Sequence, residues 1–408
     1  MRIGIDASRA FVDSPTGTET YSYQVIRHIL ALPEARKHEW ILYIKRISPS
    51  LIPPLKSSLR LASYAVRRGQ GVILKEIPLS ILWTQAGLAG RTWVDRLEVL
   101  WVPAHTLPVL RKPGLKTVVT IHGIEYEWLP EYENVLQKWY LPWSTIYAVR
   151  SATKVVAVSG FTKKQLVERL GADPGKIEVV HEGVETKIQK AKIKSVLKKY
   201  SLEEGKYLLF VGTIQPRKNL ERLVEAFAVL CNAPSDPPLK SSLRLASYAV
   251  RGGRGSYEDF RLVIAGKWGW SYEGVRGAPV KYGVEDRVVF TGYVGEIERE
   301  VLLRSCLAYV QPSITEGFGL PVLEAMAARV PVVSSRGGAL EEVTGAAGML
   351  FNPYDVKEMV ECLREVVESE GLRRELVKRG RERVKDFSWE KAARQTMKII
   401  ASLECYIK

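Results

Sequence analysis

Cysteines are few in this chain, and one common metal-binding pattern is missing from it. The four cysteines among 408 residues lie far apart, and no pair has the spacing of a metal site or a redox motif. We therefore expect free thiols in a reducing compartment. Asp-x-Asp, a pattern with which many enzymes hold a divalent metal ion, does not occur in the sequence. These residue types predict no metal site.

Long hydrophobic runs are also missing. No apolar run approaches the roughly 18 residues that a membrane-spanning helix needs. Met1 leads directly into the strand-like segment 2–6, so we expect no signal peptide. With 46% hydrophobic residues, the sequence suits two globular domains in the cytoplasm.

Acidic residues are scarce in the first half of the chain. Residues 1–200 carry 30 Lys and Arg against 17 Asp and Glu, which accounts for +13 of the formal net charge of +15. A one-sided basic surface favours an anionic partner. No nucleic-acid motif occurs, so we expect no nucleic acid and prefer an anionic membrane surface as the partner. A solvated basic face is the alternative.

Short apolar runs alternate with helical patterns through both halves of the sequence. In the first half the runs occupy residues 2–6, 39–44, 97–103, 116–121, 154–158 and 176–180. In the second half they occupy residues 207–212, 260–266, 287–292, 307–310, 332–334 and 349–351. This alternation predicts an α/β protein with two doubly wound, Rossmann-like parallel sheets, which bind ligands at the carboxyl ends of their strands. A lysine-rich stretch, residues 187–206, is expected to connect the two domains.

Two glutamates eight residues apart follow the strand at 307–310. Glu316 lies in a glycine-rich loop with Gly317 and Gly319, and Glu324 lies about one turn into the helix expected at 320–328. The glycines let a ligand approach the backbone closely. The two carboxylates could therefore bind two hydroxyl-bearing parts of one ligand. The alternative is an ordinary strand-loop-helix with solvated acids.

Two cations follow the first strand of the second half. Arg217 and Lys218 belong to a Pro-Arg-Lys-Asn loop that leads into a helix beginning at Leu220. Cations near the start of a helix oppose its dipole unless an anion is present, and both side chains bind phosphate well. The pair therefore indicates a phosphate site, with two solvated side chains as the alternative.

Two histidines follow strands of the first half and could line one cleft. His105 comes after the strand at 97–103, and His122 comes after the strand at 116–121. A lone histidine is more often structural than functional, so the pattern alone leaves both readings open. An aromatic-rich run, residues 128–147, is expected to form a helix that packs on this domain.

Four blocks of the sequence resemble one known family. E-G-F-G-L-P-V-L-E-A-M-A begins at Glu316, V-G-T-I-Q-P-R-K-N-L at Val211, T-I-H-G at Thr120 and A-V-S-G-F-T-K at Ala157. Their order and spacing resemble the retaining glycosyltransferases of family 4, the group 1 transferases, and most of all the mannosyltransferase-like members. The resemblance covers nearly the whole chain. It implies the GT-B fold, in which two Rossmann-like domains face a central cleft.

The resemblance also implies a division of the chain. Residues 1–187 would form an N-terminal domain on the acceptor side, and residues 188–388 a C-terminal domain that binds the nucleotide-sugar donor. A final helix within residues 389–408 would cross back and complete the first domain.

Roles for single side chains follow from the same resemblance. Glu316 resembles the residue that contacts the donor sugar near its reacting face, and Glu324 resembles the one that binds the ribose hydroxyls. His122 resembles a residue that lines the sugar-phosphate end. Arg217 and Lys218 would stabilise the leaving diphosphate in place of a metal ion.

Backbone groups are expected to contribute as well. The amides of four residues would face the sugar or the phosphate: Gly317, Phe318, Gly319 and Leu320. Gly17 lies in a loop that is close to the donor phosphates in related enzymes, although many relatives have two glycines there. A plain turn with Thr18 as the helix cap is the alternative for this loop.

The expected function is the transfer of a hexose, with mannose as the candidate, from a nucleotide-diphosphate sugar to a glycan or lipid-linked acceptor. Transfer would retain the anomeric configuration and need neither metal nor cofactor. The alternatives are a sugar-nucleotide epimerase or a phosphorylase of the same fold, or a non-catalytic nucleotide-sugar binder. The expected location is the cytoplasm, with peripheral attachment to the inner face of the cell membrane.

One segment of fifteen residues occurs twice without a change, at 53–67 and at 237–251. Identity in two different environments argues for a copied element inserted at two tolerant sites between core elements. The segment is also basic and amphipathic if helical, which is typical of helices that lie on membranes. A harmless surface insertion is the preferred interpretation.

Overall fold

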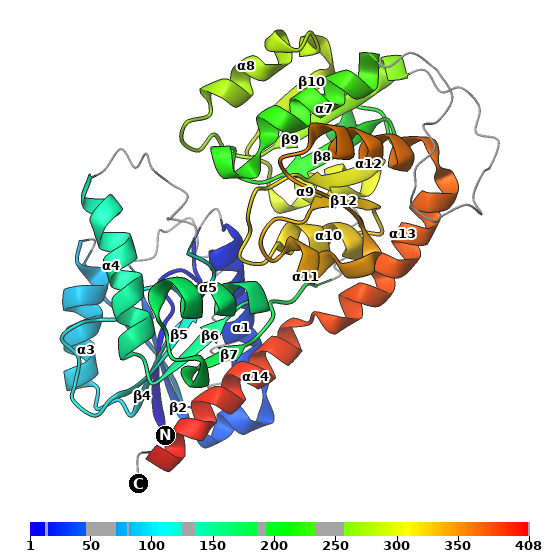
Figure 1. Ribbon diagram of the computed structural model, residues 1–408. Coiled ribbons are helices and arrows are strands. Elements are labelled where there is room, and N and C mark those ends of the chain that lie inside the picture. Colours follow the sequence, from blue (N-terminus) through cyan, green and yellow to red (C-terminus); the bar gives the residue numbers. More distant parts are fainter. Residues whose placement is uncertain are drawn as a thin grey trace. The chain divides into compact units, whose positions relative to one another are not determined.

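The computed structural model describes residues 1–12, 15–45, 71–79, 81–124, 135–185, 193–232 and 257–406. Contacts divide the chain into two compact units (Figure 1): unit 1 comprises residues 1–183 and 387–408, and unit 2 comprises residues 184–386. The predicted boundary at residue 187 lies outside the described residues. So do both copies of the repeated segment and residues 128–134 of the aromatic-rich run.

The described part of unit 1 is built on a parallel sheet of seven strands in the order β3-β2-β1-β4-β5-β6-β7. The strands are β1 (Arg2–Asp6), β2 (Glu39–Ile44), β3 (Val72–Glu76), β4 (Val99–Val102), β5 (Lys116–Ile121), β6 (Lys154–Ala157) and β7 (Ile177–Val179). The strand order reverses between β1 and β4, as in doubly wound folds. Six of these strands were predicted within a few residues, and β3 was not.

Helices cover this sheet: α1 (Gly17–Ala31), α3 (Ala89–Val94), α4 (Val135–Ser151), α5 (Gly160–Leu170) and α14 (Trp389–Ser402). The cap of α1 differs from the suggested one. Thr16, not Thr18, is its N-cap residue, and the Thr16 backbone N–H donates to Glu19 Oε2 at 3.1 Å in a capping box.

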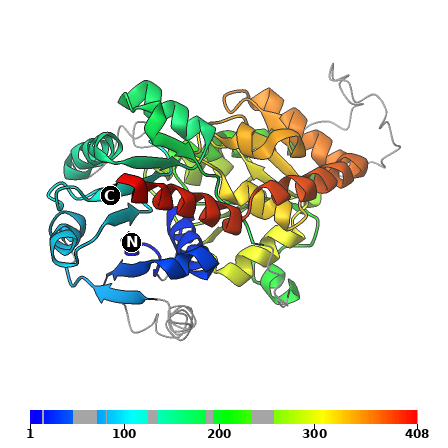
Figure 2. The same cartoon turned by 90° about the horizontal axis from the view of Figure 1, so that it is seen from below.

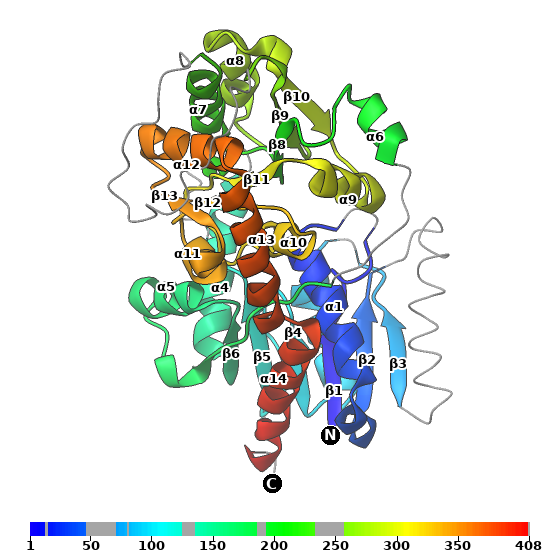
Figure 3. The same ribbon diagram turned by 90° about the vertical axis from the view of Figure 1, so that its right-hand side faces the viewer.

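The last helix of the chain belongs to unit 1. Figures 2 and 3 show α14 lying along α1, and its inward face is buried at Trp389, Thr396 and Ile400. Gly183 packs against the start of α14 so closely that a Cβ there would lie 2.1 Å from the backbone nitrogen of Trp389. Unit 1 is therefore assembled from both ends of the chain.

Unit 2 is built on a second parallel sheet, with the described strands in the order β10-β9-β8-β11-β12-β13. They are β8 (Tyr207–Val211), β9 (Arg261–Ala265), β10 (Val288–Gly292), β11 (Ala308–Gln311), β12 (Val332–Ser335) and β13 (Met349–Phe351). The accompanying helices are α6 (Ile193–Lys199), α7 (Leu220–Asn232), α8 (Glu273–Lys281), α9 (Glu296–Ser305), α10 (Leu320–Ala327), α11 (Leu340–Thr344), α12 (Val356–Glu368) and α13 (Glu370–Arg383). Both units thus have the doubly wound α/β architecture that the alternating pattern predicted.

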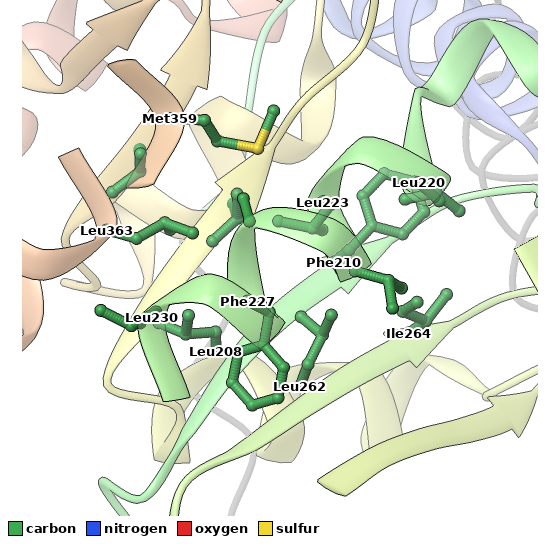
Figure 4. Packing of buried hydrophobic residues seen from close by; sticks show 14 of the residues in the cluster. Leu208, Phe210, Leu220, Leu223, Phe227, Leu230, Leu262, Ile264, Met359 and Leu363 are labelled. Atoms are coloured by element: carbon green, nitrogen blue, oxygen red, sulfur yellow. The ribbon is translucent and has the colours of Figure 1, made fainter. Parts of the chain in front are cut away.

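One side of the unit 2 sheet forms a continuous apolar core with two helices (Figure 4). Phe210 and Ile264 of the sheet pack with Phe227 of α7 and with Met359 and Leu363 of α12, and all five side chains are fully buried. This core fixes the position of α7, which begins directly after the Arg217–Lys218 loop.

No helix within the described residues is both long enough and apolar enough to cross a membrane.

Candidate active site

Two loops meet at the carboxyl edge of the unit 2 sheet. Arg217 and Lys218 form part of a 3₁₀ turn, Pro216–Lys218, that follows β8, while Glu316 lies in the loop between β11 and α10. Because β8 and β11 are neighbours in a parallel sheet, their carboxyl ends lie at the same edge. The Ile314 backbone N–H donates to the Arg217 carbonyl at 2.9 Å and joins the two loops directly.

Glu316 is the centre of a buried polar cluster, with 6% of its surface exposed. Arg217 Nη1 donates to Glu316 Oε2 at 2.6 Å, and Lys218 Nζ donates to Oε1 at 2.5 Å. Oε1 also accepts from Ser313 Oγ at 2.6 Å and from Gln311 Nε2 at 3.0 Å. The carboxylate thus accepts four hydrogen bonds, about the number that its lone pairs allow.

The charges of this cluster decide the ionisation of Glu316. Burial alone would raise the pKa of Glu316, but the charges of Arg217 and Lys218 outweigh burial and hold the pKa at about 2. Glu316 is therefore ionised at neutral pH and does not act as a general acid there. Two cations against one carboxylate leave an excess of one positive charge at this edge, which suits an anionic ligand.

Asn219 and Gly338 fix the backbone around the cluster. Asn219 adopts a left-handed conformation with φ of 59°, and its Nδ2 donates to the carbonyls of Pro312 at 3.0 Å and Pro353 at 2.7 Å. Gly338 has φ of 66°, and a Cβ there would lie 2.4 Å from the Glu316 carbonyl oxygen. Both positions tolerate few other residues, so the loop that carries Glu316 is held from two sides.

The second glutamate lies outside this cluster. Glu324 is on α10, and both of its carboxylate oxygens contact Arg299 Nη1 of α9, at 2.9 and 3.0 Å. Burial raises the pKa of Glu324, and Arg299 offsets only part of that effect. The structure therefore brings Arg217, Lys218 and Glu316 together and pairs Glu324 with a different cation.

The start of α10 is shaped by Gly319 and two buried side chains. Gly319 has φ of 115°, and a Cβ there would lie 2.7 Å from Leu340 Cδ2, so glycine is required for the turn into the helix. The side chains of Phe318 and Leu320 are buried, with 4% and 8% of their surface exposed. In the first turn of α10, Pro321 has no N–H, and the Val322 N–H donates to the Gly319 carbonyl oxygen at 3.0 Å, so a role for the backbone amides of residues 317–320 stays a prediction.

His122 and Gly17, the remaining predicted site residues, belong to unit 1. His122 follows β5, where its Nδ1 lies 2.9 Å from Glu182 Oε1 and its Nε2 lies 3.0 Å from the Pro103 carbonyl oxygen. Because a carbonyl oxygen only accepts, Nε2 is the donor in the contact with Pro103, and Nδ1 faces the Glu182 carboxylate. Both ring nitrogens are thus engaged by residues of unit 1. Gly17 is exposed at the start of α1.

His105 lies beside His122, as the strand positions suggested, with 5.8 Å between the ring centroids. Its Nδ1 is buried without a hydrogen-bond partner among the described residues. Burial, and then electrostatic interaction with His122 and Arg9, lowers the pKa of His105 to about 3. His105 is therefore a neutral imidazole at neutral pH.

Four partners of the predicted residues were missed from the sequence: Glu182, Arg299, Ser313 and Gln311. A signal existed for Glu182, because it follows β7 and the carboxyl ends of β5, β6 and β7 share one edge. Ser313 and Gln311 precede Glu316 by three and five residues, so their proximity was also available. Nothing in the sequence paired Arg299 with Glu324. Among the described residues, no three His, Cys, Asp or Glu side chains gather into a group that could hold a metal ion.

Comparisons with known proteins identify the family to which the chain is similar. The profile described as "Glycosyltransferase Family 4" matches residues 16–188, and the profile "Glycosyl transferases group 1" matches residues 192–383. The O-antigen chain mannosyltransferase B of Escherichia coli is 29% identical over 286 residues, which cover 69% of this chain and 69% of that protein. A D-inositol 3-phosphate glycosyltransferase of a Nocardioides species is 33% identical over 261 residues, which cover 62% of this chain and 54% of that protein.

A solved structure extends the agreement to the fold. The crystal structure of HepE from Anabaena, in complex with UDP and glucose, matches with a TM-score of 0.68 at 16% sequence identity and covers 99% of this chain and 100% of that one. The doubly wound units, the polar cluster on Glu316 and these matches lead to one assignment. The chain has the GT-B fold and belongs to the group 1 glycosyltransferases of family 4.

Proposed function

We propose that this glycosyltransferase moves a hexose, specifically mannose, from a nucleoside-diphosphate sugar to a glycan or lipid-linked acceptor during polysaccharide synthesis. The observation that carries the proposal is the convergence of Arg217 and Lys218 on buried Glu316 at the carboxyl edge of unit 2. A relative described as an O-antigen chain mannosyltransferase supports the sugar and the acceptor class. A structural neighbour in complex with UDP and glucose supports a nucleoside-diphosphate donor.

The two cations suit the charge that develops in the reaction. Transfer breaks the bond between the sugar C1 and a phosphate oxygen, so negative charge grows on the leaving diphosphate. Arg217 offers a planar donor fork and Lys218 a compact point charge, and both are already fixed in place before a ligand arrives. The diphosphate would replace Glu316 as their partner, and the released carboxylate would accept hydroxyl groups of the sugar. No metal ion takes part in this proposal.

The state of Glu316 supports retention by same-face attack. An ionised carboxylate that accepts four hydrogen bonds is a weak nucleophile, so a covalent intermediate on Glu316 is disfavoured. The acceptor hydroxyl then attacks from the side that the diphosphate leaves, and a phosphate oxygen takes its proton. Glu324 would bind the ribose hydroxyls, and the roles of His122 and Gly17 stay predictions from the family resemblance.

Contact with the cytoplasmic face of an anionic membrane completes the proposal. A lipid-linked acceptor must be met at a bilayer surface, and residues 1–200 carry +13 of the net charge of +15. Each Lys or Arg near an anionic leaflet contributes about 1 kcal/mol of attraction.

The decisive experiment measures mannosyl transfer and donor hydrolysis with GDP-mannose, and with UDP-glucose for comparison, in the presence of EDTA. Lys218→Ala should lower kcat/KM by about 10²- to 10³-fold, as the loss of one fixed electrostatic partner does elsewhere. Lys206→Ala, which removes an exposed lysine of the same unit, is the matched control. A Lys218→Ala enzyme within about threefold of wild type would remove Lys218 from the mechanism. Activity that EDTA abolishes and Mn²⁺ restores would refute metal independence.

A further inference from the structure

The large apolar side chains that the described part of unit 1 exposes all come from three short segments. They are Leu79, Ile81, Leu82, Trp93 and Val94 in and before α3, Val109 and Leu110 in the loop after β4, and Trp139, Tyr140 and Trp143 on α4. Four of them are largely solvent-exposed: Ile81 at 78%, Leu110 at 76%, Trp139 at 75% and Val94 at 71%. We call these ten residues the apolar face.

Hydrogen bonds join the three segments into one surface. Gln85, in the π-helical turn Trp83–Leu88 before α3, accepts from the Val109 backbone N–H at 2.9 Å and donates to the Tyr140 hydroxyl at 3.1 Å. The Lys112 backbone N–H donates to Thr92 Oγ1 of α3 at 3.0 Å. The loop after β4 therefore bridges α3 and α4, both labelled in Figure 1.

Aromatic stacking and charge give this surface its character. Trp143 stacks on Tyr147 with 5.7 Å between centroids and 14° between planes, and Arg111 Nη1 donates to the Tyr147 hydroxyl at 2.9 Å. Residues 79–94, 103–115 and 135–151 together contain five Lys and Arg and no Asp or Glu. Tryptophan and tyrosine favour the boundary between a bilayer and water, and basic residues favour anionic headgroups.

We infer that the apolar face is the surface with which unit 1 contacts an anionic lipid bilayer. The inference deepens the proposed membrane attachment and does not depend on the transfer chemistry. It assigns the attachment to an aromatic and aliphatic surface with basic neighbours, rather than to charge spread over the first half of the chain.

A glycan chain is a poorer occupant of this surface. Glycans are bound through their hydroxyl groups, which need carboxylates and amides beside the aromatic rings. The three segments contain no carboxylate, and the Gln85 amide is already used by Val109, Tyr140 and the Leu107 carbonyl. Exposed Ile81, Val94 and Leu110 have no role against a sugar but bury well among acyl chains.

Vesicle flotation tests the inference on the full chain. The probes are phosphatidylcholine vesicles with and without phosphatidylglycerol, at low and high salt. Leu110→Glu puts an acidic group on the apolar face, and Val280→Glu is the matched control because Val280 is an aliphatic residue of unit 2 that is 69% exposed. The double variant Trp139→Ala/Trp143→Ala removes the aromatic contribution without adding charge.

We expect the wild type and Val280→Glu to float with the vesicles that contain phosphatidylglycerol and not with those that lack it. Both variants of the apolar face should bind the anionic vesicles roughly tenfold or more weakly. Donor hydrolysis without vesicles should be the same in all four proteins, so a failure here is separable from a failure of the transferase proposal. Equal binding by Leu110→Glu and Val280→Glu would overturn the inference. It would also be overturned if wild type bound a soluble polysaccharide or a second copy of itself through these residues and ignored lipid.

Discussion

Glu316→Gln should weaken unit 2 and at the same time make it more responsive to anions. The amide keeps the size of the side chain and can still hydrogen-bond to Ser313 and Gln311. It loses the charge that balances Arg217 and Lys218, which lie 2.6 and 2.5 Å from the carboxylate oxygens. The variant therefore leaves two neighbouring cations at the carboxyl edge without an anion between them.

Two independent arguments give the size of the effect. Breaking a buried ion pair by removing one partner costs about 3–5 kcal/mol. The pKa of Glu316, about 2 against an ordinary value of 4.5, corresponds to on the order of 3 kcal/mol of stabilisation by the cluster. For a unit of this size each kcal/mol shifts the midpoint by about 2–4 °C, so we expect a decrease in Tm of roughly 10 °C.

The assay is thermal unfolding at low salt with and without inorganic pyrophosphate, which can take the place of the missing carboxylate. Pyrophosphate should raise the Tm of Glu316→Gln more than that of the wild type, whose cations already have a partner. Glu324→Gln is the control, because it removes a partly buried carboxylate that pairs with Arg299 instead. This interpretation of the cluster would be refuted if Glu316→Gln had the same Tm as the wild type, or if pyrophosphate raised the Tm of both proteins by the same amount.

Three further predictions follow from single contacts. Asn219→Ala should lower the free energy of unfolding, measured by urea denaturation, by about 2–4 kcal/mol, because it loses two buried hydrogen bonds and puts alanine in a left-handed conformation. Asn219→Gly should lower it less, because glycine adopts that conformation without strain. Glu182→Ala should lower the free energy of unfolding by about 3 kcal/mol or more, because it leaves Nδ1 of His122 unpaired, and Glu182→Gln should lower it less. Equal stability of the two variants would contradict the role of this contact. Because its pKa is depressed, ionised Glu316 stabilises the folded protein fully above about pH 4.5, and this stabilisation is lost as the pH falls towards 2. Acid unfolding followed by circular dichroism should therefore show a loss of stability in this pH range for the wild type that is missing in Glu316→Gln.

Strands and helices with a regular pattern of apolar residues could be predicted from the sequence. Those whose pattern is interrupted by charged residues, glycine or proline were missed. The buried strands of both sheets are short runs of apolar residues, so most could be placed within a few residues. β3 was missed because it is a half-exposed edge strand that ends in charged Lys75 and Glu76. α8 was missed because Gly277 and Pro279 lie inside it, and both weaken a helical pattern. α6 lies in the lysine-rich stretch that was interpreted as a connector.

The candidate site divides in a similar way. Arg217, Lys218 and Glu316 could be named from the sequence because charged side chains follow neighbouring strands. Their mutual contact could not be predicted, because Lys218 and Glu316 are 98 residues apart and the distance between them depends on the packed sheet. For the same reason the sequence left His122 as an available side chain, whereas the structure shows both of its ring nitrogens engaged.

The assembly of unit 1 from both ends of the chain has a consequence for biosynthesis. A ribosome releases the residues of unit 2, which are continuous from 184 to 386, before any of α14 has been made. Until then α1 has no partner for the surface that Trp389, Thr396 and Ile400 later cover, and Gly183 has no helix to pack against. Domains usually fold in the order of their synthesis. Here unit 1 is begun before unit 2 and completed after it, so the folding of unit 1 has to wait for the synthesis of α14.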